Sequence, residues 1–143
     1  MPDAGLGHRT GDATVSAILP APETTPPITM EQVMAFAAAS GDSNPVHFSE
    51  DTARAAGLAG PVLHGMIVAE RFETFLERMG GYEIAELQVG FVRPVPVGSA
   101  LTIAVRPIDV SGPRHHLRLL ATVEGVLVAI AEARLEPLSV PAL

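Results

Sequence analysis

The spacing of apolar residues predicts helices in the first part of the chain. Val33 and Ala37 recur at the spacing of one helix face. Thr29 precedes this segment and Gln32 follows three residues later, an arrangement typical of a capping box. We therefore expect a helix that begins after Thr29 and ends near Ser40.

Two further helices are predicted downstream. Ser49 can cap a short helix that ends at Gly57. The longest predicted helix runs from about Gly65 to Met79, where a glycine pair at 80–81 ends it. Its first turns, Met66–Ala69, are apolar on every side, so we expect this end of the helix to be buried all round.

The apolar period changes to two in the second half of the chain, which indicates strands with one buried face. Alternation marks four segments, around residues 87–91, 101–105, 117–123 and 126–135. Glu124–Gly125 is a two-residue hairpin turn before the last of them. A short strand is also expected over 13–19, followed by a proline-rich loop over 20–27. Helices followed by antiparallel strands define the α+β class.

The pattern has a consequence for assembly. A helix that is apolar all round needs a sheet wrapped around it, and one sheet covers only part of the helix. A symmetric dimer would complete the burial. The length of 143 residues fits one domain, and we find no repeat or interdomain linker, so residues 1–143 are expected to form a single domain.

Composition narrows the possible functions. Apolar residues make up 48% of the chain and aromatic residues only 4%, so the core must be mainly aliphatic. The absence of cysteine excludes disulfides, thiolate zinc sites and cysteine nucleophiles. A net charge of −7 gives no basic footprint for nucleic acid. No segment reaches the roughly 20 apolar residues of a membrane span, and residues 1–11 lack the apolar core of a signal peptide, so a cytoplasmic protein is expected.

Residues 41–48 combine groups that suit the activation of water. Pro45 cannot continue a helix and pushes Asn44 toward an extended conformation, so the chain must bend between Asp42 and His47. An imidazole that titrates near neutrality can take a proton from water or return one, and a nearby carboxylate can hold the same water. Asp and Asn are also common turn residues, and His47 can cap a helix or lie on the surface. The residues alone leave both interpretations open.

The start of the longest helix offers a second set of groups. Gly65 would let a ligand approach free backbone N–H groups, which together with the helix dipole stabilise a developing oxyanion. Close packing at Gly65 and a simple structural role for His64 explain the same residues. His115 and His116 are adjacent on a predicted strand, so their side chains point to opposite faces, and we expect a solvated strand end there. No residue spacing indicates a metal site.

Residues 36–53 resemble the signature of the MaoC-like hydratases, also called hydratase 2 or (R)-specific enoyl-CoA hydratases. The residues that carry this resemblance are Phe36, Ser40, Gly41, Asp42, Asn44, Pro45, Val46, His47 and Ala53. Residues 61–66 look like the second block of the family and residues 91–98 like its third. The blocks occur in the family's order, and the resemblance covers a core of about residues 10–136.

This resemblance implies a hotdog fold, an antiparallel sheet wrapped around a long central helix, usually as a homodimer. It implies that Asp42 and His47 activate water, that Asn44 positions them, and that the backbone N–H of Gly65 is the oxyanion donor. Met66 and His64 would help to line the substrate site. The implied reaction interconverts trans-2-enoyl and (R)-3-hydroxyacyl thioesters. No cofactor is required, since coenzyme A or phosphopantetheine, the latter on acyl-carrier protein, is part of the substrate.

The sequence departs from the family at Ser43, where relatives often carry a larger and more hydrophobic residue. This difference predicts a wider or more polar site, and a substrate other than a plain short enoyl chain. Two alternatives stay open: an acyl thioesterase, and a specialised dehydratase or acyl-binding component of a biosynthetic, polyketide-like pathway. Thioesterases of this fold usually carry their acidic group on the long helix, and the Asp42-to-His47 loop favours hydration instead.

Overall fold

The structure, a computed structural model, describes residues 19–139. One five-stranded antiparallel sheet with the order β1-β3-β4-β5-β2 dominates it. The strands are β1 (Glu23–Thr24), β2 (Tyr82–Phe91), β3 (Thr102–Asp109), β4 (His115–Val123) and β5 (Val126–Pro137).

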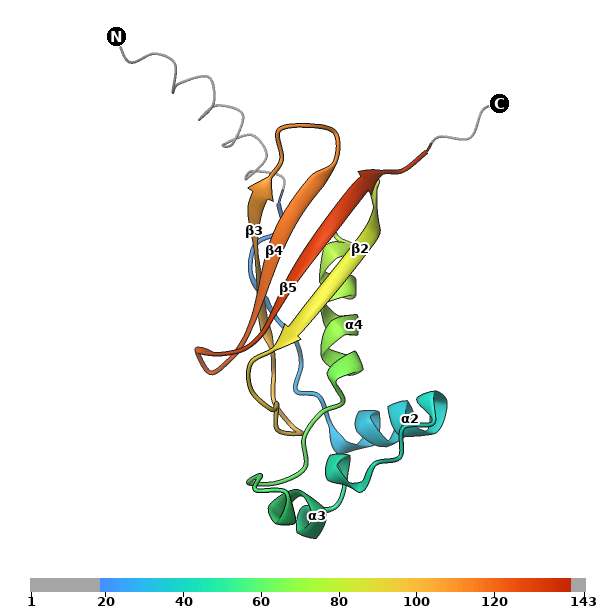
Figure 1. The fold of residues 1–143 in the computed structure, drawn as a ribbon, viewed down its shortest axis with the longest axis vertical. Helices are drawn as coiled ribbons and strands as arrows, with labels where there is room; N and C mark the ends of the chain where they lie inside the picture. Colours follow the sequence, from blue (N-terminus) through green and yellow to red (C-terminus); the bar gives the residue numbers. More distant parts are fainter. Residues whose placement is uncertain (1–18, 140–143) are drawn as a thin grey trace.

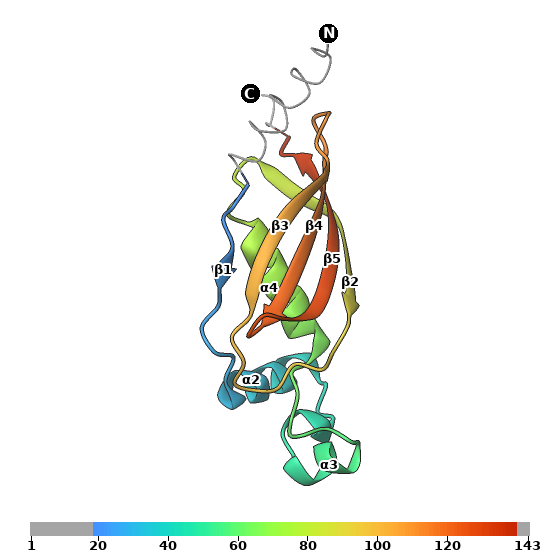
Figure 2. The same ribbon diagram turned by 90° about the vertical axis from the view of Figure 1, so that its left-hand side faces the viewer.

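The helices occupy one face and one end of this sheet. They are α2 (Met30–Ser40), the short 3₁₀ helix η1 (Pro45–His47), α3 (Glu50–Ala55) and α4 (Gly65–Leu76). The sheet curves around α4, while α2 and α3 lie beyond its lower end, beside the N-terminal end of α4 (Figures 1 and 2). Helices and strands therefore segregate in space as they do along the chain, which confirms the predicted α+β class. Within residues 19–139, no helix has the length and apolar character needed to cross a bilayer.

The predicted helix starts are confirmed by their caps. The hydroxyl of Thr29 accepts the N–H of Gln32, and the Gln32 side chain accepts the N–H of Thr29 at 2.9 Å, which completes the capping box. The Ser49 hydroxyl accepts the N–H of Thr52 at the start of α3. At the end of α2, Gly41 has φ of +80°, a left-handed conformation that glycine adopts without strain.

The strand predictions hold for the four long strands. Glu124 and Gly125 have φ of +49° and +81°, the paired positive values of a tight hairpin turn, and they join β4 to β5 as expected. The prediction of a loop over 20–27 is wrong at two residues. Glu23 and Thr24 form β1, in which they pair with Ile103 and Thr102 of β3. The strand predicted over 13–19 lies, up to residue 18, outside the described residues.

The long helix is shorter than its pattern predicted. It ends at Leu76, although apolar spacing extends to Met79. After Leu76 the backbone tightens, because the N–H of Arg78 bonds to the carbonyl of Phe75 and the N–H of Met79 to that of Leu76. Hydrogen bonds between residues three apart form turns and do not continue the α-helix. Met79 is nevertheless part of the core, with 5% of its surface exposed.

The core lies between α4 and the concave face of the sheet. Phe72 on α4 is the largest fully buried side chain. On β5 the inward residues include Ala129, Ala131 and Ala133, each fully buried. Because these side chains are short, α4 can pack close to the sheet. Close packing of this kind suits a core with few aromatic residues.

One burial prediction is wrong for the single chain. Ile67, Val68 and Ala69 are buried, but the side chain of Met66 is 65% exposed. The sheet covers only one side of α4, and Met66 points away from it. The apolar character of this first turn is therefore not satisfied within one chain.

The histidine pair at the start of β4 divides between the two faces, as predicted, but it is not a solvated strand end. His115 is buried, and its Nε2 lies 2.8 Å from the hydroxyl of Tyr82. His116 lies on the outer face, where its Nε2 is 3.2 Å from Glu132. Hydrogen bonds from Arg118 and His116 hold the pKa of the Glu132 carboxyl below its ordinary value. The sequence pattern missed His115 because its polar partner, Tyr82, lies on β2, two strands away across β5.

The core packing predicts a large difference between two leucines. Leu119 is fully buried in β4, whereas Leu138, beyond β5, is 51% exposed. Leu119→Ala should lower the free energy of unfolding by about 2–5 kcal/mol through lost burial and the cavity left behind. Leu138→Ala, the same chemical change, should alter it by less than about 0.5 kcal/mol. Urea denaturation measures both, and equal effects would contradict the placement of the core.

Candidate active site

The loop after α2 is built by local hydrogen bonds. The Ser40 hydroxyl accepts the N–H of Asp42 at 3.1 Å, and Oδ1 of Asp42 accepts the N–H of Asn44 at 3.3 Å. Oδ1 of Asn44 then caps η1 by accepting the N–H of Val46 at 3.1 Å. Polar side chains and the ring of Pro45 thus produce the bend that the sequence predicted, and the amide of Asn44 serves the loop itself.

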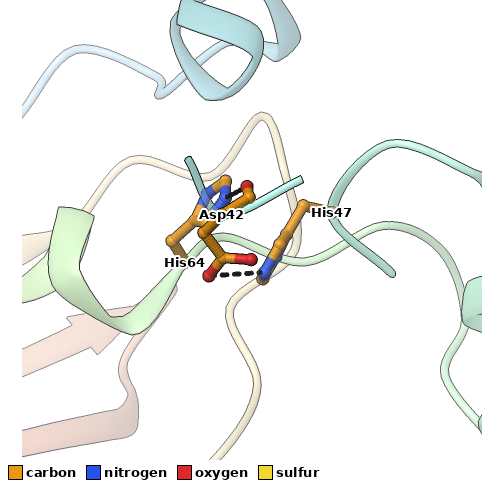
Figure 3. A group of neighbouring side chains, drawn as sticks. All are labelled: Asp42, His47 and His64. Carbon is orange, nitrogen blue, oxygen red and sulfur yellow. Dashed lines mark hydrogen bonds and ion pairs between the residues drawn. The ribbon is translucent and has the colours of Figure 1, made fainter. Parts of the chain in front are cut away.

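His47 is held in one tautomer by the backbone. Its Nδ1 lies 2.8 Å from the carbonyl oxygen of Val62. Because a carbonyl oxygen only accepts hydrogen bonds, Nδ1 carries the proton and donates it. In the neutral ring, Nε2 therefore has a free lone pair. This atom lies 3.8 Å from Oδ2 of Asp42 (Figure 3).

That distance decides what the pair can do. A gap of 3.8 Å between Nε2 of His47 and Oδ2 of Asp42 is too long for a direct hydrogen bond. The Asp42 side chain is 54% exposed and the His47 side chain 11% exposed, so the carboxylate meets solvent while the imidazole is sheltered. The pair presents a base and an acceptor to a small polar molecule that contacts both.

His64 lies directly behind this pair. Its ring is 2% exposed and stacks on His47, with centroids 3.6 Å apart and an angle of 24° between the planes. Its Nε2 lies 3.0 Å from the carbonyl oxygen of Asp42. Phe36 contacts the same ring at a centroid distance of 4.7 Å. Residues from α2, the following loop and the start of α4 therefore meet at one point.

The same three side chains must be considered as metal ligands. Within residues 19–139, Asp42, His47 and His64 can bring one ligand atom each to within 4.8 Å of the others. Nitrogen lone pairs lie in the plane of an imidazole, so those of stacked rings run side by side instead of converging on an ion. His64 also commits Nε2 to a backbone carbonyl. The geometry suits acid–base chemistry better than metal binding.

The remaining predicted site residues take different positions. Gly65 is the first residue of α4, directly after His64. The N–H of Ile67 in this turn bonds to the carbonyl of His64 at 3.1 Å, which leaves the N–H groups of Gly65 and Met66 without an intrahelical partner. The aromatic ring of Phe91 lies against Gly65. Met66 and Ser43 are both exposed, and neither forms a hydrogen bond with Asp42 or His47. The carbonyl of Val62 is a functional group that the sequence did not reveal, since a backbone atom carries no residue signal.

An open groove lies beside the site. Its volume is about 810 Å³, and its wall includes Phe48, Leu58, Val62, Arg93 and Pro96. Val62 joins the groove to the site, because its carbonyl holds His47. Two charged residues also line this largely apolar groove: Arg93, and Glu50, whose carboxylate is paired with Arg54 at 3.1 Å.

The curved sheet around one helix defines a hotdog-fold protein. The solved structure of the (R)-hydratase from A. caviae involved in PHA biosynthesis has a TM-score of 0.75 and 27% identity, over 82% of this chain and 93% of that chain. The family model described as MaoC like domain matches residues 16–125. The chain belongs to the MaoC-like domain family, as its signature residues predicted.

Curated relatives are larger proteins. The fatty acid synthase subunit beta of Gibberella zeae is 35% identical over 114 residues, which cover 71% of this chain and 6% of the relative. The mitochondrial 3-hydroxyacyl-[acyl-carrier-protein] dehydratase of Arabidopsis thaliana is 32% identical over 79 residues, covering 54% of this chain and 48% of the relative. The chain therefore spans less than half of each of these relatives.

The contact between Gly65 and Phe91 predicts a coupled effect. A Cβ at residue 65 would lie 2.9 Å from Cζ of Phe91, so the ring must move in Gly65→Ala. We expect unfolding free energy to fall by about 1 kcal/mol, because the ring is half-exposed and can shift. Phe91→Leu in the same chain should recover this loss. Thermal and urea unfolding of the four combinations measures the coupling.

Gly60→Ala is the control for this comparison, since nothing lies within 4 Å of a Cβ at residue 60. It should leave the unfolding free energy within about 0.5 kcal/mol of the parent. Additive effects of Gly65→Ala and Phe91→Leu would show that the two residues do not crowd one another.

Proposed function

We propose that the protein is a hydratase or dehydratase that interconverts trans-2-enoyl and (R)-3-hydroxyacyl thioesters. The observation that carries this proposal is the fixed tautomer of His47. Its Nδ1–H donates to the Val62 carbonyl, which leaves the Nε2 lone pair facing the Asp42 carboxylate across 3.8 Å. A base and an acceptor at this separation suit one shared water molecule.

In the hydration direction the atoms balance without a cofactor. The water oxygen forms a bond to Cβ of the enoyl group, and one of its protons passes to Nε2 of His47. The carboxylate of Asp42 accepts a hydrogen bond from the other. Nε2 of His47 then returns its proton to Cα as the double bond is lost, so that the ring ends neutral, and dehydration follows the same steps in reverse. The named activity of the A. caviae relative, an (R)-hydratase, supports this reaction and its stereochemistry.

Charge that develops on the thioester oxygen needs a donor. The N-terminus of α4 presents the N–H groups of Gly65 and Met66, which have no intrahelical partner, together with the positive end of the helix dipole. Gly65 occupies the first position there, so no side chain of its own covers its N–H. Stabilisation of an enolate-like oxygen by such groups is a large contribution to rate in related chemistry.

The groove supports a thioester substrate. Its volume of about 810 Å³ and its apolar wall suit an extended phosphopantetheine arm, and Arg93 offers a partner for a phosphate. Coenzyme A and acyl-carrier protein share this arm. The Arabidopsis relative is named for an acyl-carrier-protein substrate, so both carriers belong in any assay.

Absorbance of the conjugated enoyl group provides the test. Trans-2-enoyl and (R)-3-hydroxyacyl thioesters of several chain lengths, on coenzyme A and on pantetheine, are incubated with the protein. We expect reversible loss of the enoyl signal. Asp42→Asn and His47→Ala should each lower kcat by about 10²- to 10⁴-fold, because each removes one side of the water site.

Asp109→Asn is the matched control. This carboxylate is exposed at the end of β3, and hydrogen bonds from Ser111 lower its pKa. Its substitution should leave kcat unchanged, and circular dichroism should show all variants folded. Release of free thiol, which a thiol reagent detects, would contradict the proposal and indicate a thioesterase.

We also propose that the protein forms a homodimer through β2. This 10-residue strand lies at the edge of the sheet, and long edge strands are normally covered. Three exposed apolar side chains, Met66 (65%), Phe91 (53%) and Val92 (49%), belong to the first turn of α4 and the end of β2. A second copy paired along β2 would cover the edge and extend the sheet.

Sedimentation equilibrium and amide exchange test this assembly together. The mass should be twice the 14.9 kDa of one chain. Amides of β2 that do not face β5 should exchange slowly, because the partner strand accepts them. A monomer at all concentrations, with fast exchange at those alternate amides, would refute pairing along β2.

A further inference from the structure

The buried ring of His64 has no role in the chemistry proposed above. It is 2% exposed, and its Nδ1 has no hydrogen-bond partner. A buried polar atom without a partner is costly, so a histidine at such a place needs an explanation. An apolar ring of similar shape would avoid that cost.

The other ring nitrogen provides the explanation. Nε2 of His64 lies 3.0 Å from the carbonyl oxygen of Asp42, so Nε2 carries the proton and donates it. Nδ1 is then an unprotonated acceptor. The ring therefore acts as a hydrogen-bond donor through Nε2 and as an aromatic surface against His47.

The contacts of His64 reach both members of the proposed catalytic pair. Its Nε2–H holds the backbone of Asp42, and its face supports the ring of His47 at 3.6 Å. Phe36 contacts the ring of His64 at 4.7 Å. Figure 3 shows the His64 ring bonded to the Asp42 backbone while the Asp42 carboxylate turns toward His47.

We infer that His64 is a positioning residue that sets the separation between the Asp42 carboxylate and Nε2 of His47. It does so by anchoring the Asp42 carbonyl while its face fixes the plane of the His47 ring. This role rests on the proposed hydratase function, and it gives His64 no contact with substrate. A small displacement of either group would lower the rate, because a misplacement of about 1 Å can cost roughly 100-fold.

Two substitutions separate the donor from the ring. His64→Phe keeps an aromatic face for His47 but loses the N–H donor. His64→Gln loses the ring but keeps an amide N–H at a similar distance from the backbone. We expect His64→Phe to lower kcat by about 10- to 100-fold with little change in KM. His64→Gln restores the N–H donor but not the ring face, so it should recover part of that loss and leave kcat below that of the wild type.

His115→Phe is the matched control. His115 is also buried, also has an unpartnered Nδ1, and also commits Nε2 to an oxygen, the Tyr82 hydroxyl at 2.8 Å. It lies on β4, whereas His64 precedes α4. This variant should lose stability as His64→Phe does, with kcat unchanged. If His64→Phe and His115→Phe lost kcat equally, the loss would reflect general destabilisation of the protein, and the inference would be overturned.

A measurement without substrate separates this inference from the proposed function. The ¹³C resonance of the Asp42 carbonyl reports its hydrogen bond. It should move upfield in His64→Phe, return toward the wild-type position in His64→Gln, and stay in place in His115→Phe. An unmoved resonance in His64→Phe, or equal kcat in His64→Phe and wild type, would overturn the inference. If the wild-type protein turned over no thioester, the proposed function would fail while the carbonyl resonance still tested the anchor.

Discussion

The packing of α4 against the concave face of the sheet is the contact on which the rest of the structure depends. The short side chains of Ala129, Ala131 and Ala133 let α4 pack close to β5, and Phe72 of α4 is fully buried in this core. Because α4 is fixed along its length, its N-terminal end has a defined position at the rim of the sheet. The N–H groups of Gly65 and Met66, which have no partner within the helix, are thereby presented at one place, beside the loop that follows α2.

The site itself is assembled largely through main-chain atoms. The carbonyl of Val62 orients His47, the carbonyl of Asp42 receives His64, and Asn44 and Ser40 bond to backbone N–H groups. Side chains of one segment thus hold the backbone of another segment in place. This explains how a short loop that contains a single 3₁₀ turn can hold the imidazole of His47 and the carboxylate of Asp42 3.8 Å apart.

Much of the fold could be predicted because local chemistry determines it. The capping box at Thr29 and the Glu124–Gly125 turn depend on neighbours in sequence, and both are confirmed. The end of α4, the exposure of Met66 and the burial of His115 depend on which elements lie nearby in space. Asp42 and His47 could be predicted as one site because the bend at Pro45 is local. Their partners, Val62 and His64, come from another segment, and the Val62 contact uses an atom common to all residues.

Residue 62 serves two purposes through two different parts of one residue. The residue lines the groove, while its carbonyl fixes the proton on His47. A substitution at this position can reshape the groove and still leave the backbone carbonyl in place. Under the proposed function, a change of side chain at residue 62 would therefore alter substrate preference while His47 keeps the same tautomer.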